Sequence, residues 1–434
     1  MLSLCGLVGA LLLLIVLTIR GTNLMIAAPT TALIVALSGS LPLLSSAGPT
    51  PNEGFIETYM EGFSGFIAAW FFMFLLGSIF GKLMEDSGAA DSVSKWITNR
   101  LGTKNAVVAV VLACAVLTYG GVSVFVVAFS AYPLAVSLFK QADLPRRFIP
   151  GTMAFGSVTF TMTSAGSPEI QNWIPIKYLG TSPYAAWEVS LFVALLMAAL
   201  GFWWLRRMIM RAKANGESFV DRAGDPDTQK RRLPHPITAV LPLITVLAVT
   251  YVTHEQLKQT ALILALAAGS AVAWLINHRF FTSVSNALSN GAMGALIAIG
   301  NTAAVVGFGA VAKASPAFDL AVNMLTGIPG NELIGAALAV TTIAALTGSA
   351  SGGQSIALPV LAPFYLDLGV NPEALHRVVA ISSGALDSLP HNGYVVTTVR
   401  AICGETHRDA YGPVAALTVV VPLLGTALAI LLLL

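Results

Sequence analysis

The sequence predicts an all-α polytopic membrane protein, and its composition is the first observation behind that prediction. The 434 residues are 56% hydrophobic and only 10% charged, whereas soluble domains carry roughly 25% charged residues. Apolar stretches long enough to cross about 30 Å of hydrocarbon recur from one end of the chain to the other. We therefore expect the chain to cross a lipid bilayer many times.

An internal duplication is the second observation. A segment starting at Leu117 combines a threonine, a centre rich in small residues, an apolar run to Pro133 and a later Leu-x-Arg, and the same order of features starts again at Leu346. Matching residues, such as Pro133 and Pro363, are separated by a nearly constant interval of about 230 residues. Broken apolar segments at corresponding places in two halves are typical of the binding site of a secondary transporter.

The duplication divides the chain into two halves joined by a linker. Each half is expected to contain five spanning helices, one of them broken, and one re-entrant hairpin. Because an odd number of crossings inserts two similar sequences in opposite orientations, we predict two inverted-topology repeats. The predicted units are a first repeat at 1–208 with a hairpin at 104–140 and a broken helix at 147–178, a linker at 209–235, and a second repeat at 236–434 with a hairpin at 331–367 and a broken helix at 375–400.

The distribution of Lys and Arg predicts the orientation in the membrane. The linker at 209–235 is rich in both residues, so the positive-inside rule places it in the cytoplasm, and the loop at 45–55 has neither, so it is expected outside. Both chain termini are then external. The first apolar run is followed by Arg20 and preceded by no positive residue, which indicates a retained helix and not a cleaved signal peptide.

Glycine and polar residues gather at the predicted hairpin tips and helix breaks. Irregular backbone at membrane depth is tolerated only where it is buried in protein or lines a cavity. The free N–H groups at a helix start suit an anion such as a carboxylate, and neutral polar side chains suit hydroxyl groups. The predicted substrate-binding residues are Thr118, Gly120, Gly121, Ser123, Thr163, Ser164, Ser167, Ser349, Ser351, Gly352, Gly353, Gln354, Ser355, Ser388 and Asn392.

Three ionisable side chains fall at the same helix breaks. Glu169 follows Pro168, which is expected to begin a second half-helix, and Asp387 and His391 belong to the break of the second half. Ionisable groups inside a membrane are costly and usually functional, so we predict that Glu169, Asp387 and His391 couple transport to protons. The structural alternative is that Glu169 caps a half-helix, Asp387 accepts bonds from loop N–H groups and His391 donates a structural bond.

Other kinds of chemistry find little support in the sequence. The three cysteines are scattered with no metal-ligand spacing, so we expect no disulfide framework, metal site or cofactor. No basic patch interleaved with aromatic residues indicates nucleic acid. An intramembrane enzyme would rest only on Ser388 near His391, with no oriented third group. An anion channel built from the same helix ends stays open as an alternative.

Several motifs carry a resemblance to a known family. They are Gly352-Gly353-Gln354-Ser355, Asp387-Ser388-Leu389-Pro390-His391-Asn392-Gly393 and Cys403-Gly404-Glu405-Thr406-His407. With them the chain resembles the gluconate permease family of the ion transporter superfamily over nearly its whole length. The run from Phe155 to Pro175 is similar to the branch of D-3-hydroxybutyrate permeases. The resemblance implies proton-coupled uptake of a small hydroxy-monocarboxylate across a bacterial inner membrane, by a homodimer.

The first hairpin tip bears on the size of the substrate. It consists mainly of Gly, Tyr and Val with Ser123, whereas a polyol acid would need many polar side chains around its hydroxyl groups. We therefore expect D-3-hydroxybutyrate, with gluconate or another sugar acid as the alternative. Sodium stays open as the coupling ion, because broken helices rich in Gly and Ser supply carbonyls that bind it. The expected partners are the carboxylate, protons or sodium, and the lipid bilayer.

Overall fold

The structure is a computed structural model of the chain, and it describes residues 2–20, 22–45, 54–102, 105–222, 232–318, 320, 331–390 and 392–434. This part of the chain folds into helices and contains no strand. The helices are α1 (Leu2–Ile19), α2 (Leu24–Ser38), α3 (Phe55–Asp86), α4 (Ala89–Leu101), α5 (Ala106–Tyr119), α6 (Val124–Gln141), η2 (Arg146–Phe148), α7 (Ile149–Ala154), η3 (Phe155–Thr159), η4 (Ile170–Asn172), α8 (Ile174–Leu179), α9 (Trp187–Ala214), α10 (Pro236–Leu257), α11 (Gln259–Asn277), η5 (His278–Phe280), α12 (Val284–Lys313), α14 (Glu332–Thr347), α15 (Ala350–Asp367), α16 (Pro372–Ser383), α17 (Gly393–Val396), η6 (Thr397–Ile402), α18 (His407–Ala415), η7 (Ala416–Val420) and α19 (Val421–Leu433).

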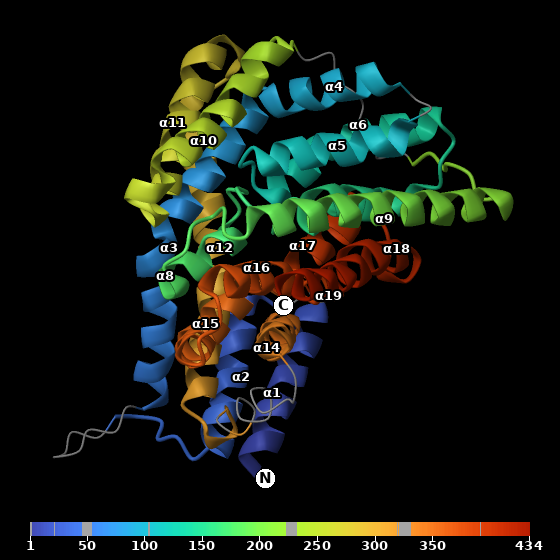
Figure 1. Cartoon of the computed structure of the whole chain (residues 1–434). Helices are drawn as coiled ribbons and strands as arrows, with labels where there is room; N and C mark the ends of the chain where they lie inside the picture. Colours follow the sequence, from blue (N-terminus) through green and yellow to red (C-terminus); the bar gives the residue numbers. More distant parts are fainter. Residues whose placement is uncertain are drawn as a thin grey trace.

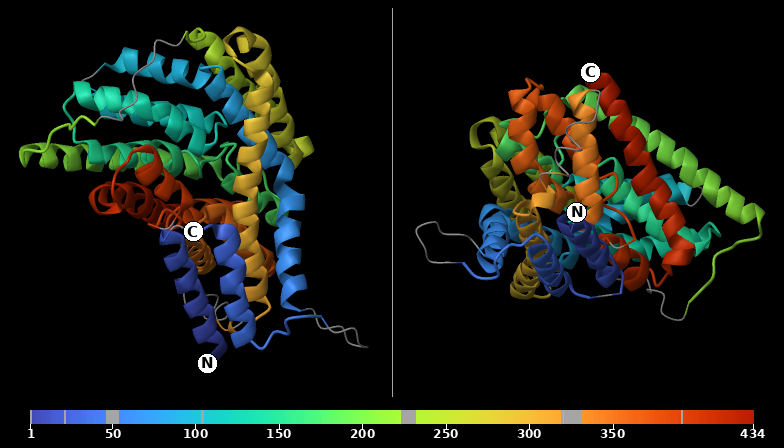
Figure 2. Two further views of the ribbon diagram at one scale, coloured as in Figure 1. Left: turned by 180° about the vertical axis from the view of Figure 1, so that it is seen from behind. Right: turned by 90° about the horizontal axis from the view of Figure 1, so that it is seen from below.

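Two sets of helices cross in the molecule (Figure 1). The long helices α3 and α12 lie side by side, and α5, α9 and α19 run across them. The views from behind and from below in Figure 2 show the same crossing. Helix α2 packs on α12, and α11 packs on α3. We call α2, α3, α11 and α12 the frame, because they pack side by side and the second arms of the two predicted hairpins, α6 and α15, lie against α3 and α12.

Small residues bring α3 and α12 together along their length. Gly62 of α3 faces Gly307 of α12, and Ile79 of α3 faces Gly291, so the two helices are antiparallel. A Cβ atom on Gly291 would lie 2.8 Å from the Cα of Ile79. Between apolar helices, such close backbone approach supplies much of the van der Waals attraction. The hydroxyl of Tyr59 adds a hydrogen bond of 2.9 Å to the carbonyl of Ala304.

The expected all-α, multi-pass character is confirmed. Within the described ranges, seven helices are long and apolar enough to cross a membrane. They include α3, α9 and α12, and also α6, which belongs to the first predicted hairpin. Helices α1, α2, α5 and α14 are apolar but shorter. Inverted repeats and re-entrant hairpins stay predictions, because helix length alone does not distinguish a hairpin arm from a crossing.

Each predicted hairpin consists of two helices joined by a tight turn. Helices α5 and α6 meet at Gly121 (φ +91°), and α14 and α15 meet at Gly348 (φ +60°). Both turns need the left-handed backbone region that glycine occupies at no steric cost. Each tip is therefore a sharp reversal after which a new helix begins.

The broken helix of the first half differs from the expectation at its second start. A half-helix does not begin at Pro168; a 3-10 turn at Ile170–Asn172 comes first, and α8 begins only at Ile174. The side chains of Asn172 and Trp173 donate hydrogen bonds to the carbonyl of Ser167, which holds the chain in a compact turn there. Pro175 then occupies the start of α8, where its missing N–H has no consequence.

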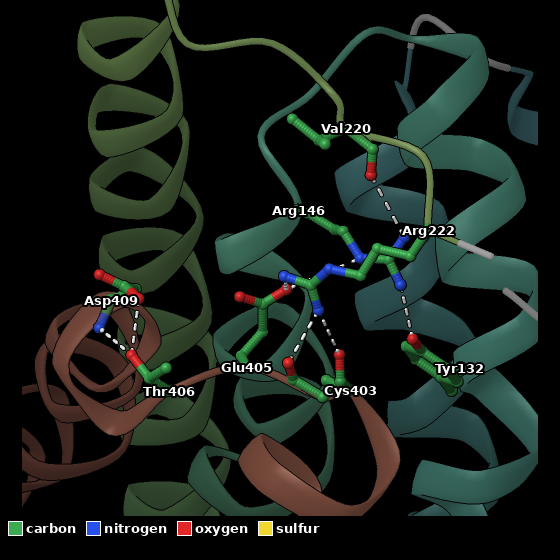
Figure 3. A network of polar contacts seen from close by, with 9 residues as sticks. Tyr132, Arg146, Val220, Arg222, Cys403, Glu405, Thr406 and Asp409 are labelled. Atoms are coloured by element: carbon green, nitrogen blue, oxygen red, sulfur yellow. Dashed lines mark hydrogen bonds and ion pairs between the residues drawn. The ribbon is translucent and has the colours of Figure 1, made fainter. Parts of the chain in front are cut away.

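The described part of the linker is anchored to both halves of the chain. Glu217 forms two hydrogen bonds with Arg147 at 2.6 and 2.8 Å, and these bonds lower the pKa of the Glu217 carboxyl. Figure 3 shows Arg222 reaching from the linker to Glu405, at 2.9 Å, and to the carbonyl of Cys403. This segment therefore lies across the end of the first hairpin and the loop before α18. Residues 223–231 of the predicted linker lie outside the described ranges.

We expect Gly291→Ala to lower the melting temperature of the purified protein, because the new Cβ would overlap the backbone of Ile79. Overpacking of this kind costs roughly 1–3 kcal/mol. Gly65→Ala in α3 is the matched control, since nothing lies within 4 Å of that Cβ position, and alanine is the better helix former. A thermal unfolding scan in detergent in which Gly291→Ala melts no lower than Gly65→Ala would contradict this packing.

Candidate functional site

A cavity of about 800 Å³ lies between the frame and the two hairpin tips. Helices α3 and α12 form one wall, and the starts of α6 and α15 contribute to the other. Residues from both helix breaks, among them Glu169 and Asp387, complete the lining. The cavity therefore brings together the two hairpin tips and the two helix breaks that the sequence predicts, although these four segments lie far apart along the chain.

The second arms of both hairpins begin at this cavity. Ser123 holds the position before α6, and its side chain makes no capping bond. Ser349 holds the same position before α15, and its hydroxyl accepts a hydrogen bond of 3.2 Å from the N–H of Gly352. The positive ends of two helix dipoles thus open onto one space. Such ends favour negatively charged groups by typically about 0.3–1 kcal/mol each, and more when partly buried.

Each tip is tied to the helix break of its own half. In the second half, the amide of Asn392 donates to the carbonyl of Gly348 at 2.9 Å, and its oxygen caps α17 by accepting from Val395. In the first half, the hydroxyl of Tyr119 donates to the carbonyl of Ala165 at 2.5 Å. A change in the position of either break would therefore move the tip beside it.

Three carboxylates line the cavity; Glu85 is paired with Lys82, and the other two, Asp387 and Glu169, differ in their surroundings. Asp387 accepts a hydrogen bond of 2.9 Å from the Ser388 hydroxyl and lies against the backbone N–H of Ala350 at the start of α15. This is the structural contact that the sequence left open for Asp387. Glu169 is only partly buried and, among the described residues, has no hydrogen-bond or ion-pair partner for its carboxylate. Glu169 therefore faces the cavity as an unpaired acid.

The structure separates the predicted site residues into two groups. Those that line the cavity are Gly121, Ser123, Ser349, Ser351, Ser388, Asn392, Glu169 and Asp387. Those that lie behind it are Thr118, Gly120, Thr163, Ser164, Ser167, Gly352, Gly353, Gln354 and Ser355. His391 is outside the described residues.

The residues behind the cavity pack the tips against neighbouring helices. A Cβ atom on Gly353 would meet the backbone of Ala344 at 2.7 Å, and the amide of Gln354 donates to the Ser383 hydroxyl at 2.8 Å. The first turn of a helix presents only one side to a cavity, so the residues on the other sides of that turn face neighbouring helices. A sequence pattern marks the turn but not the side that it exposes.

The frame contributes polar residues that the sequence reading did not place at the site. Ser78 and Lys82 of α3, together with Asn290, Asn301 and Thr302 of α12, line the cavity. Lys82 is held by Glu85 at 3.0 Å and Asp86 at 3.2 Å. Their one signal in the sequence is that they are polar residues inside otherwise apolar helices, where such residues usually face protein or water.

Arg377 of α16 holds the first break in place from the second half. Its side chain is fully buried, and its three nitrogens donate to Ala185 and Pro183 carbonyls, to the Thr163 carbonyl and to the Asn172 amide oxygen, over 2.7–3.2 Å. Asn172 in turn donates to Ser167, two residues before Glu169. The rigid fork of arginine donors suits this set of fixed acceptors.

A second buried arginine occupies the matching place in the first half. Arg146 is 6% exposed and reaches across to Glu405 at 3.6 Å, in the loop that follows the second broken helix. Its guanidinium also donates to the Tyr132 hydroxyl at 2.8 Å and to the Val220 carbonyl at 3.4 Å (Figure 3). Each arginine thus contacts the loop after the broken helix of the other half.

Comparison with known proteins identifies the class to which this architecture belongs. The chain is 36% identical over 451 aligned residues to the uncharacterized transporter YxjC of Bacillus subtilis strain 168, and the match covers 92% of each protein. The chain belongs to the YxjC family of transporters. No family model matches it. As a member of this family it is a multi-pass membrane transporter, and the expected class is confirmed, because the relatives are transporters and not enzymes.

More distant comparisons agree with this family assignment. The D-serine transporter DsdX of Escherichia coli K12 is 25% identical to this YxjC-family protein, over 92% of the chain and 93% of DsdX. An uncharacterized transporter of Haemophilus influenzae Rd is 25% identical over 79% of the chain. Among solved structures, the YdaH transporter of Alcanivorax borkumensis matches with a TM-score of 0.58 over the whole chain at 17% identity, which is a likeness of fold.

We expect Arg377→Lys to destabilise the protein strongly and to abolish transport. Lysine keeps the charge but cannot reach all the buried acceptors, and each lost hydrogen bond to a charged group costs about 1.5–3 kcal/mol. Arg147→Lys is the matched control, because Arg147 forms a partly exposed pair with Glu217, and such pairs contribute about 0–1 kcal/mol. Equal melting temperatures for the two variants would contradict the role given to Arg377.

Proposed function

We propose that this protein is a secondary active transporter that imports a small hydroxy-monocarboxylate together with protons, and that D-3-hydroxybutyrate is its substrate. The observation that carries the proposal is the opening of two helix N-termini, those of α6 and α15, onto one cavity that also contains Glu169 and Asp387. The relationship to transporters supports the general class. The chemistry of the cavity and the resemblance to the gluconate permease family support the proposed substrate and coupling ion.

The carboxylate of the substrate is expected to bind between the two hairpin tips. Helix N-termini combine free N–H donors with positive dipole ends, which suits one carboxylate without a buried cation. The only cation among the described lining residues is Lys82, and its ammonium is occupied by Glu85 and Asp86. Hydroxyl groups of Ser123 and Ser349 lie at the same two helix starts.

The coupling proposal rests on the charges that line the cavity. Glu169 and Asp387 are both carboxylates, and in a medium of low dielectric each would repel an incoming carboxylate strongly. Protonation of one of them removes this repulsion. Glu169 is the better candidate for the proton that accompanies the substrate, because it has no partner, whereas Asp387 is bonded to Ser388 and the start of α15.

The inverted-topology arrangement belongs to the same proposal. The contacts of α2 with α12 and of α11 with α3 support it, because they relate corresponding helix pairs of the two halves. The cross-contacts of Arg146 and Arg377 support it in the same way. A homodimer in a bacterial inner membrane, with both chain termini external, completes the proposed organisation.

D-serine is a second candidate substrate, because a relative is named as a D-serine transporter. D-serine and D-3-hydroxybutyrate both carry a hydroxyl group on the β-carbon, C3, counted from the carboxylate carbon. They differ in the ammonium group of serine, which would need a free anionic or carbonyl partner in the cavity. Glu169 could meet that need only in its charged form, in which it would not carry the coupling proton.

The decisive test is uptake of labelled D-3-hydroxybutyrate into proteoliposomes with an imposed inward proton gradient and no sodium. We expect accumulation that collapses with a protonophore and competes weakly with gluconate. Accumulation that appears only with sodium would show that sodium, and not the proton, is the coupling ion. Strong inhibition by D-serine or gluconate would show that the inhibitor, and not D-3-hydroxybutyrate, is the preferred substrate. Currents far above carrier turnover would indicate an anion channel.

Glu169→Gln should separate binding from coupling. A neutral side chain of the same shape mimics protonated Glu169, so substrate exchange across the membrane should continue, while accumulation driven by the proton gradient should be lost. Glu188→Gln is the matched control, since Glu188 is an exposed residue in the first turn of α9. Unchanged proton-driven accumulation in Glu169→Gln would reject Glu169 as the coupling group. Asp387→Asn would then be the variant that tests the other carboxylate.

A further inference from the structure

Asn301 is a neutral polar residue of the cavity that has no assigned role so far. Asn301 lies in the middle of α12, where the neighbouring Gly300, Ala303 and Ala304 are buried. Its side chain lines the cavity together with residues of both hairpin tips.

Among the described residues, the side chain of Asn301 has no hydrogen-bond partner. An amide of this kind has two donors and an acceptor, and leaving buried polar groups unpaired costs about 1–3 kcal/mol. Its neighbour Thr302 also lines the cavity, but its hydroxyl is satisfied by the carbonyl of Ala298 at 3.1 Å. Of these two adjacent polar side chains, Asn301 is the one that is free to bind a ligand.

The position of Asn301 relative to the second hairpin can be followed along α12. Val305, one turn further on, lines the same cavity and lies 3.7 Å from the Cβ position of Gly352 in the first turn of α15. Asn301 therefore lies on the frame side of the cavity, near the height of the second tip. A molecule whose carboxylate sits at the helix starts would direct its other end toward α12.

We propose that Asn301 is the specificity-determining residue that binds the hydroxyl group of the substrate. This assignment rests on the proposed function, and it names the group that distinguishes the substrate from other short carboxylates. A hydroxyl both donates and accepts, as does the amide of Asn301, so one side chain satisfies it completely. The same hydroxyl position occurs in D-serine.

The two walls of the cavity are proposed to bind different groups of the substrate. The helix starts of α6 and α15 bind negative charge and are common to all carboxylates, so they discriminate poorly among them. The cavity is larger than a four-carbon acid, so its volume alone does not select the substrate either. An analogue without the hydroxyl would leave the half-buried amide of Asn301 unpaired, and such a mismatch is an effective means of selection.

Two variants, Asn301→Leu and Asn301→Ala, test the assignment in proteoliposomes. Leucine approximates the volume of asparagine without its polar atoms, and alanine is the better helix former in case leucine impairs folding. For each variant, one measures the concentrations of unlabelled D-3-hydroxybutyrate and of butyrate that halve the initial uptake of tracer D-3-hydroxybutyrate. Asn286→Leu is the control, because Asn286 is an exposed residue in the first turn of the same helix and does not line the cavity.

We expect the wild type and Asn286→Leu to prefer D-3-hydroxybutyrate over butyrate, and we expect this preference to fall about tenfold in both Asn301 variants. One net hydrogen bond to a ligand has about this effect. The loss should come from weaker binding of the hydroxy acid, with butyrate unchanged. Equal weakening of both acids, or an unchanged preference, would overturn the assignment while leaving the proposed function intact. Failure of the wild type to accumulate the hydroxy acid would overturn both.

Discussion

The buried guanidinium of Arg377 is the contact on which the geometry of the site most depends. It extends from the second half of the chain and binds fixed acceptors on both sides of the first helix break, including Asn172 and Pro183. Through Asn172 it fixes the turn that carries Glu169. Because a buried charge must have its hydrogen bonds satisfied, the first break is held in one arrangement, and the two halves form the cavity together.

The charges of the cavity then define its chemistry. In the proposed mechanism, the two helix N-termini favour an anion, and the unpaired carboxylate of Glu169 opposes it until a proton is bound. Opposing effects in the same space link the two ligands, because each makes binding of the other more favourable. Asp387 has a different role in this account, since it joins the second break to the start of α15 and so keeps the tip in place.

The sequence predicted the elements of this site better than their orientation. The turns at Gly121 and Gly348 fall inside the segments predicted as hairpins at 104–140 and 331–367, because a left-handed turn between two apolar helices leaves a clear signal. The start of the second half-helix was misplaced at Pro168, since the side chains of Asn172 and Trp173 fold back onto Ser167, and such a contact has no local pattern. The facing side of α12 was likewise undetermined, because an apolar helix with few polar residues has no obvious inner surface.

The most direct test of the account is an experimental structure determined with D-3-hydroxybutyrate bound. The account predicts the carboxylate within hydrogen-bonding distance of the first N–H groups of both α6 and α15, with the hydroxyl group directed toward Asn301 on α12. A carboxylate bound at Lys82, or a substrate in contact with only one hairpin tip, would contradict the central claim that the two tips form one anion site.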